Sequence, residues 1–329
     1  MKKVRLGMTM GDPSGIGPAI IAKAAAKIGR RARVTVIGDA WVLEKAAGNR
    51  FSTPRVENPS GAGSSFSLVD LANVPRKNFS FGKVRYAYGR ASLEYLDTAV
   101  RLLKERRIDC LVTCPVSKEA AGKAGFSFPG HTEYLAHAFG ARDTVMMLLN
   151  RRLRIALATT HLPLRRVARA LTAARICRTL KVTTEHLKAL WHISRPRIAV
   201  CGLNPHASDA GRFGSEEGRV ITPAILRARR LLKNTCIEGP FPADAALHRA
   251  YRGEYDCAVA MYHDQALIPL KLLENAAGVN MTLGLPFART SPLHGTAFDI
   301  AACPAKADPS SLLEAIRVAI QCASAQKKD

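Results

Sequence analysis

Apolar runs with the character of β-strands alternate along this chain with amphipathic helical patterns. The strand-like runs are VRLGMTM, RVTVIGD, DCLVTCPVS, TVMMLLN, RIALATTH, RIAVCGLNPH, YDCAVAMYHDQ and GVNMTLGLP. The helical patterns cover residues 17–29, 90–106, 164–190, 219–233, 244–252 and 310–323. Such alternation predicts a wound α/β architecture with a largely parallel or mixed sheet. Residues 52–82, rich in Ser, Pro, Gly and Asn, are expected to form a loop.

Three histidines stand just beyond three of these strand-like runs. They are His161 in ALATTHLPL, His206 in AVCGLNPHA and His263 in AVAMYHDQA. Ligand-binding groups of α/β folds gather at the carboxyl ends of strands, and imidazoles fixed there can hold a divalent metal with an open coordination position. A single histidine in such a position is more often a hydrogen-bonded structural residue than a ligand, but all three share one context, which favours the metal site.

Composition indicates a globular protein without a membrane span. The 329 residues suffice for two domains or one large α/β unit, 47% of them are hydrophobic, and no apolar run approaches ~18 residues. The start MKKVRLGMTMGDP leads directly into a strand, so we expect no secretory signal. The 8 cysteines lack paired CxxC spacings and are expected to be buried and reduced, as in a cytoplasmic protein.

The net charge of +23 raises the question of nucleic-acid binding. The basic residues fall mainly on amphipathic stretches such as LRRVARALTAARICRTLK and ILRARRLLK, which are typical of solvated faces of core-packed helices. Aromatic residues make up only 6% and do not interleave with the basic ones, so the stacking platforms of single-strand binders are missing. The charge indicates a general attraction for anionic ligands.

Three further motifs carry candidate binding groups. GDPSGIGPA, residues 11–19, is either a glycine loop that approaches an anion or a tight structural turn. PGHTEYLA, residues 129–136, places His131 and Thr132 at a helix start, where they could hold an anion or where Thr132 could serve only as a cap. The segment from Tyr262 to Phe298 is dense in polar groups among turn residues, which is typical of a site wall.

In combination these motifs resemble the 4-hydroxythreonine-4-phosphate dehydrogenase (PdxA) family. The resemblance runs from residue 6 to about residue 320 and rests on GDPSGIGP, PGHTEYLA, THLPL, GLNPHA, GPFPAD, AMYHDQ-LIPLK and GVNMTLGLPFARTS-HGTAFDIA. It implies two α/β domains with a cleft between them, related to isocitrate and isopropylmalate dehydrogenases. We expect residues 1–130 plus 275–329 in the first domain and 131–274 in the second, which would carry the metal ligands and dimer contacts.

The resemblance also implies a reaction. Members of the family oxidise a secondary alcohol with NAD or NADP while a divalent metal (Zn, Mg or Co) is bound, and the resulting β-keto acid loses carbon dioxide. The expected substrate is a small anion, in the first place 4-phosphohydroxy-L-threonine, and the expected assembly is a homodimer with a shared active site. Neither nucleic acid nor membrane is an expected partner. A basic nucleic-acid-binding protein without enzymatic activity is the distant alternative.

The family's site residues fall on intact positions of this sequence. The implied metal ligands are His161, His206 and His263, the last from the neighbouring subunit, and the implied substrate contacts are His131, Thr132, Lys271, Asn280 and Arg289. Lys271 and Asp264 are the candidates for proton handling, because an amine near a metal can have a lowered pKa. Asp244 is a further catalytic candidate, and the residues that bind the nicotinamide cofactor are not identified.

Three departures from the family pattern bear on the substrate. Ala19 and Leu293 stand where the family usually has acidic residues, and Ser208-Asp209-Ala210 replaces Gly-Glu-Gly. Fewer carboxylates would favour an additional anionic group on the substrate or disfavour an ammonium group. The alternatives are therefore a phosphorylated threonate or erythronate, and the cis-dihydrodiol of terephthalate, which gives protocatechuate.

Overall fold

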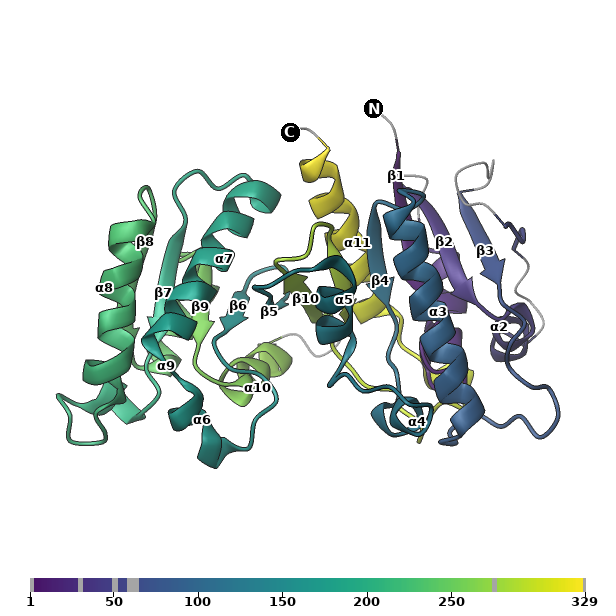
Figure 1. Ribbon diagram of the computed structural model, residues 1–329, viewed down its shortest axis with the longest axis horizontal. Helices are drawn as coiled ribbons and strands as arrows, with labels where there is room; N and C mark the ends of the chain where they lie inside the picture. Colours follow the sequence, from purple (N-terminus) through teal and green to yellow (C-terminus); the bar gives the residue numbers. More distant parts are fainter. Residues whose placement is uncertain (1–2, 29–31, 49–52, 58–64, 274–276, 328–329) are drawn as a thin grey trace. The chain divides into compact units, whose positions relative to one another are not determined.

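The computed structural model describes residues 3–28, 32–48, 53–57, 65–273 and 277–327. Its contacts divide the chain into two compact units (Figure 1). Unit 1 comprises Met1–Ala141 and Leu285–Lys327, and unit 2 comprises Arg142–Gly284 and Lys328–Asp329.

Unit 1 is built on a parallel sheet. In sheet order its strands are β3 (Phe66–Asp70), β2 (Ala32–Gly38), β1 (Val4–Thr9), β4 (Cys110–Thr113) and β11 (Arg289–Pro292). Its helices are α1 (Gly17–Ala25), α2 (Ala40–Ala46), α3 (Tyr86–Lys104), α4 (Lys118–Lys123), α5 (His131–Phe139), the 3-10 turn η4 (Pro304–Lys306) and α11 (Ser310–Gln326). Because α3 packs on β1 and β2, and α11 packs on β1, β4 and β11, the central strands are buried and read as continuous apolar runs.

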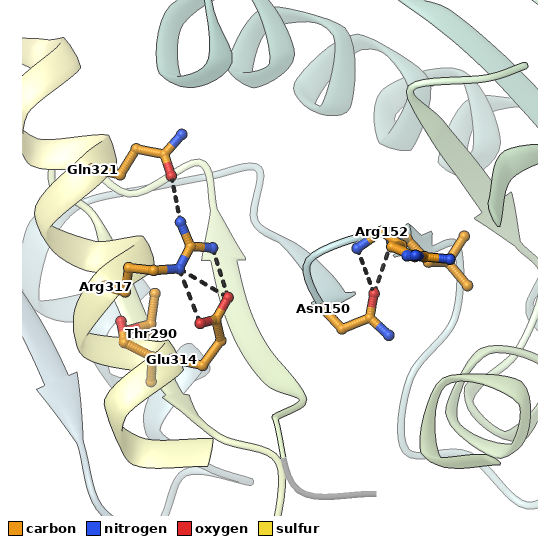
Figure 2. Close-up of polar contacts among 8 residues, drawn as sticks. Asn150, Arg152, Thr290, Glu314, Arg317 and Gln321 are labelled. Carbon is orange, nitrogen blue, oxygen red and sulfur yellow. Dashed lines mark hydrogen bonds and ion pairs between the residues drawn. The ribbon is translucent and has the colours of Figure 1, made fainter. Parts of the chain in front are cut away.

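The short strand β11 is fixed to α11 by side-chain contacts. Thr290 donates its hydroxyl to the carbonyl of Ala315 at 2.8 Å. Beside it on the helix, the buried carboxylate of Glu314 accepts from Arg317 Nη2 at 2.6 Å, and Arg317 also reaches Gln321 (Figure 2). The Thr290 bond ties β11, the strand that carries Arg289, to α11.

Unit 2 contains a mixed sheet. Its strands in sheet order are β10 (Val279–Leu283), β5 (Val145–Leu149), β6 (Arg154–Leu157), β9 (Cys257–Ala260), β7 (Arg197–Cys201) and β8 (Cys236–Phe241). The β10–β5 and β5–β6 pairs are antiparallel, whereas the strands from β6 to β8 are parallel. The tight β5–β6 turn is closed by Asn150, whose side-chain oxygen accepts from the backbone N–H groups of Arg152 and Leu153 (Figure 2).

Helices cover the sheet of unit 2 in two groups. They are α6 (Leu164–Ala170), α7 (Ala173–Trp191), the turns η2 (Pro205–Ser208) and η3 (Glu217–Ile221), α8 (Thr222–Leu231), α9 (Ala243–Tyr251) and α10 (His263–Leu273). Helix α7 packs on β5, β6 and β10 and is joined by α8, whereas α9 packs on β7 and β9 and α10 packs on β5, β6 and β9.

All eight predicted strands are present, and the α/β prediction is confirmed at this level. The predicted helix 164–190 is two helices, because Thr172 leaves helical geometry and caps α7 by accepting from the N–H of Arg175. The expected loop 52–82 contains β3, and its residues 52 and 58–64 lie outside the described part of the chain, as does residue 29 of the predicted first helix.

The contact division differs from the predicted domain boundaries. Helix α5, assigned by sequence to the second domain, belongs to unit 1, and β10, assigned to the first, belongs to unit 2 because it pairs with β5. The predicted boundary between residues 274 and 275 lies outside the described residues.

The cysteines are free thiols, as expected. Cys236 and Cys303 are nevertheless exposed, whereas the other six are buried. No helix among the described residues is long and apolar enough to span a membrane.

Candidate active site

The three candidate metal ligands follow three neighbouring parallel strands of unit 2. His161 comes after β6, His263 after β9 and His206 after β7, and these strands adjoin in the order β6-β9-β7. Since parallel strands end at the same edge of a sheet, the three loops emerge at one edge. The strand-end location predicted from sequence is thereby confirmed for all three histidines.

His161 and His263 face each other across this edge. Their ring centroids are 5.5 Å apart. Two imidazoles that share one tetrahedral metal, with metal–nitrogen distances of about 2.0–2.1 Å, have ring centres about 5 Å apart, so the pair fits such an ion. His263 Nδ1 lies 2.7 Å from Asp264 Oδ1, a contact that orients the ring.

His206 lies in a different local environment. It is exposed and has left-handed backbone geometry, with φ 53°. In the described part of the chain no three or more His, Cys, Asp or Glu side chains form a group that could hold a metal. Within one chain His263 lies beside His161. That His263 completes the site of a neighbouring subunit, as the resemblance implies, stays a prediction.

A second polar cluster lies in unit 1 around Arg289, the first residue of β11. Its guanidinium is 3% exposed and donates from Nη2 to Thr113 Oγ1 at 2.6 Å. The same Nη2 lies 3.4 Å from His131 Nδ1. Because a guanidinium only donates, Nδ1 is the acceptor, and the remaining ring proton is on Nε2.

Burial sets the charge states of this cluster. Burial of the ring, reinforced by the positive charge of Arg289, lowers the pKa of His131 to about 3, so the ring is neutral near pH 7. Burial also lowers the pKa of Arg289 to about 10, against the opposing effect of Glu133, and the guanidinium stays charged. A cavity of about 110 Å³ with a mostly apolar wall adjoins His131; it is lined by Leu93, Val116, Lys118, Ala121, Phe126, Phe128, Pro129, Gly130 and His131.

The remaining candidate residues are dispersed. Thr132 is in the first turn of α5, whereas Lys271 is exposed near the end of α10 and Asp244 is in the first turn of α9. Asn280 is on β10, and its buried side-chain oxygen has no hydrogen-bond partner among the described residues. Since buried polar atoms are nearly always paired, Asn280 fits a residue that binds a ligand.

The glycine motif at residues 11–19 contains a hydrogen-bonded turn. The N–H of Asp12 donates to the carbonyl of Pro115, that of Ser14 to the Asp12 carboxylate, and that of Ile16 to the carbonyl of Thr296. Gly15 packs closely on this segment, since a Cβ there would meet the Thr296 carbonyl oxygen at 3.1 Å. The N–H groups of Asp12, Ser14 and Ile16 are therefore used within the fold.

The three departures occupy separate places. Ala19 is buried in α1 and lines a surface hollow of about 400 Å³ together with Lys23 and Lys45. Leu293 is half-buried after β11, and its N–H donates to Ser311 Oγ at 2.9 Å. Ser208 and Ala210 follow His206 and have positive φ values of 72° and 55°.

Sequence reasoning missed Thr113, which contacts the buried guanidinium. Its only signal was its position at the end of the DCLVTCP strand, since the contact depends on the parallel pairing of β4 with β11.

Comparison with known proteins supplies the family. Residues 30–319 match the family described as pyridoxal phosphate biosynthetic protein PdxA. The chain belongs to the PdxA family. A 4-hydroxythreonine-4-phosphate dehydrogenase of Desulforapulum autotrophicum is 41% identical over 322 residues, which cover 95% of this chain and 94% of that protein. A D-threonate 4-phosphate dehydrogenase of Cupriavidus necator is 42% identical and covers 97% of each chain.

Solved structures agree with this assignment. The crystal structure of a 4-hydroxythreonine-4-phosphate dehydrogenase from Klebsiella pneumoniae superposes with a TM-score of 0.86 at 38% identity, covering 98% of each chain. A terephthalate 1,2-cis-dihydrodiol dehydrogenase from Burkholderia xenovorans LB400 is more distant, with a TM-score of 0.66 at 31% identity over 97% of this chain and 98% of that one. The chain is therefore a nicotinamide-dependent dehydrogenase of the PdxA family, which sets aside the nucleic-acid-binding alternative.

Proposed function

We propose that this PdxA-family dehydrogenase oxidises the secondary alcohol of a small phosphorylated hydroxy acid with NAD or NADP, and that the product then loses carbon dioxide. The first candidate substrate is 4-phosphohydroxy-L-threonine, which would give 3-amino-2-oxopropyl phosphate. The observation that carries the proposal is the family membership together with three histidines at the ends of adjacent parallel strands.

Arg289 and His131 are proposed to bind an anionic group of the substrate. The buried guanidinium supplies fixed positive charge, and neutral His131 retains a proton on Nε2 that can be donated to a phosphate or carboxylate oxygen. Thr132 and Asn280 are proposed to add hydrogen bonds to the substrate. A substrate analogue that lacks the oxygen or amine bound by Thr132 and Asn280 would leave these side chains without a hydrogen bond and would bind more weakly.

His161, His206 and His263 would hold a divalent metal, which would supply Lewis-acid polarisation of the substrate's oxygens during both oxidation and decarboxylation. The hydroxyl proton must go to a base as hydride leaves for the nicotinamide. Because Asp264 is engaged with His263, its role is to orient that ligand, which leaves Lys271 as the candidate base. Asp244 is a candidate for a supporting proton-transfer role.

The histidine edge of unit 2 also carries exposed apolar residues. Leu164 on α6 is 71% exposed and Leu272 on α10 is 78% exposed, and they are accompanied by Leu162, Ile268 and Leu273. Exposed apolar residues at this density are typical of a protein interface. We therefore propose that a second copy of the chain covers α6 and α10 and that the active site is shared in the dimer.

The proposed dimer is tested by measuring the molecular mass of the protein in solution. Leu272→Asp should shift the mass toward the monomer, whereas Leu231→Asp, at a 63% exposed position on α8, should leave it unchanged. A parent chain that is monomeric at assay concentrations would contradict the shared site.

A second candidate substrate is favoured by one specific observation. Leu293 is half-buried and apolar where the family usually has an acidic residue, which disfavours a substrate with an ammonium group and favours D-threonate 4-phosphate. The terephthalate dihydrodiol is the third candidate, since the dehydrogenase that uses it is the more distant structural relative.

The decisive experiment measures NADH or NADPH formation with the three acids side by side, before and after loading with Zn²⁺, Co²⁺ or Mg²⁺. Turnover should require the metal and should be abolished in His206→Ala but retained in His248→Ala, an exposed histidine of α9. Undiminished turnover in His206→Ala, or no reduced cofactor with any of the acids, would overturn the proposal.

A further inference from the structure

The pleat of β11 directs the side chain of Arg289. Neighbouring side chains of a strand point to opposite faces of its sheet. Thr290 donates to the carbonyl of Ala315 on α11, so Arg289 lies on the face of the sheet that is turned away from α11. On that face its guanidinium meets Thr113 and His131.

Thr113 is the last residue of β4, two positions beyond the strand partner of Arg289. The parallel register pairs Arg289 with Leu111 and Thr290 with Val112. The Arg289 side chain must therefore extend along the strand direction to place Nη2 2.6 Å from the Thr113 hydroxyl oxygen. Because β4 and β11 are parallel, this direction leads to the carboxyl edge of the sheet, where ligand-binding groups of α/β folds gather.

The two contacts of Nη2 fix the plane of the guanidinium. This nitrogen carries two N–H bonds in that plane, and its acceptors are Thr113 Oγ1 at 2.6 Å and His131 Nδ1 at 3.4 Å. Thr113 is 1% exposed and belongs to a strand that is paired on both sides, with β1 and with β11. His131 is only half-buried and begins helix α5. Thr113 is therefore the nearer and the more firmly held of the two acceptors.

The orientation of this guanidinium matters for anion binding. Arginine binds a phosphate or a carboxylate through N–H donors that are fixed in one plane, so the plane must face the anion. A long side chain that is already held in the bound orientation loses less conformational freedom when the anion arrives. A buried hydroxyl that holds Arg289 should therefore raise the affinity for an anion that the hydroxyl itself does not contact.

We propose that Thr113 is a positioning residue for anion binding: its hydroxyl holds the Arg289 guanidinium in the orientation in which it meets an anionic group of the substrate. This inference rests on the proposed role of Arg289 in substrate binding. Thr113 acts on the substrate only through Arg289.

The test measures anion affinity apart from turnover. Inorganic phosphate and malonate are titrated into the protein by calorimetry, and the thermal midpoint of each variant is recorded. Thr113→Val replaces the hydroxyl with a methyl group and removes the acceptor, whereas Thr113→Ser keeps it. Thr35→Val is the matched control: Thr35 is 3% exposed on β2 of the same sheet, and its hydroxyl lies 3.1 Å from Ser67 Oγ, with β1 between β2 and β4.

We expect Thr113→Val to weaken binding of the anion that the parent holds more tightly by about 5–10-fold, while Thr113→Ser and Thr35→Val stay within about twofold of the parent. With an acid that the parent oxidises, KM should rise by a similar factor and kcat should change less, because the lost contact serves the ground state and the transition state alike. If Thr113→Val does not fold, Thr113→Cys replaces it, since a thiol is only a weak acceptor.

Parent-like anion affinity in the folded Thr113 variant, or an equal loss in Thr35→Val, would overturn the positioning role and leave the proposed function intact. A parent protein that binds neither phosphate nor malonate would overturn the proposed binding role of Arg289 and this inference with it.

Discussion

The partly buried imidazole of His131 makes a quantitative prediction about stability and pH. Its pKa is lowered from 6.5 to about 3 in the folded protein, first by burial and second by the charge of Arg289. The unfolded chain therefore binds a proton that the folded chain refuses, and the stabilising contribution is present above about pH 6.5 and lost as the pH falls toward about 3. Between about pH 7 and about pH 5 the loss amounts to about 2 kcal/mol.

The perturbation is His131→Asn, which removes the titrating group and keeps a polar side chain. Urea unfolding of parent and variant at both pH values gives four free energies, and the difference of differences isolates His131 from all other titrating groups. The parent should lose about 2 kcal/mol more than the variant on acidification, whatever the variant's stability at neutral pH. Equal losses in the two proteins would refute the assignment of a neutral, enclosed imidazole.

Three further predictions concern packing, a buried hydrogen bond and the metal. Gly89→Ala in α3 should destabilise unit 1 by about 3 kcal/mol, because the new Cβ would lie 2.0 Å from the Ala120 carbonyl oxygen. Gly122→Ala should instead stabilise unit 1 by about 0.5–1 kcal/mol, since its Cβ would meet nothing within 4 Å. Thermal unfolding of the two variants and the parent measures both effects. Tyr95→Phe should lower the free energy of unfolding in urea by about 1.5–3 kcal/mol, since the buried hydroxyl donates to Asp39 at 2.6 Å. An unchanged free energy of unfolding would contradict a charged Asp39 carboxylate that depends on this donor. After the metal is removed with a chelator, Zn²⁺ or Co²⁺ should restore NADH formation better than Mg²⁺ at equal concentration. The reason is that imidazole is a good ligand for Zn²⁺ and Co²⁺, whereas Mg²⁺ prefers oxygen ligands. Better restoration by Mg²⁺ would contradict a metal site made of three histidines.

The parts of the fold that could be predicted are those whose signal is local. Strands such as β1 and β9 are buried on both faces, so their residues form unbroken apolar runs that identify them in the sequence. Strand β11, Arg289–Pro292, has no such run and exists because it pairs with β4 and because Thr290 bonds to α11. The four residues of β11, Arg-Thr-Ser-Pro, contain no local signal for a strand that exists because of tertiary contacts.

The site divides in the same way. His161, His206 and His263 could be located because each directly follows a predictable strand. The contact of Arg289 with Thr113 joins residues 176 positions apart and required the strand order. The role of the glycine motif was likewise undecidable from spacing, because the groups that occupy its N–H donors, at Pro115 and Thr296, come from distant segments.

The two clusters differ in how complete they are within one chain, and this difference has a consequence for assembly. In unit 1, the buried Arg289 contacts both His131 and Thr113, and the charge states of Arg289 and His131 are already set. In unit 2, His161 and His206 are exposed, and no group of three metal-binding side chains forms among the residues described. We infer that anion binding needs only a folded chain, whereas tight metal binding needs the dimer. Dilution or the Leu272→Asp variant should therefore weaken Zn²⁺ affinity. Binding of inorganic phosphate, measured by calorimetry, should be retained under the same conditions. A Zn²⁺ affinity that does not depend on dimerisation would show that one chain completes the ligand set.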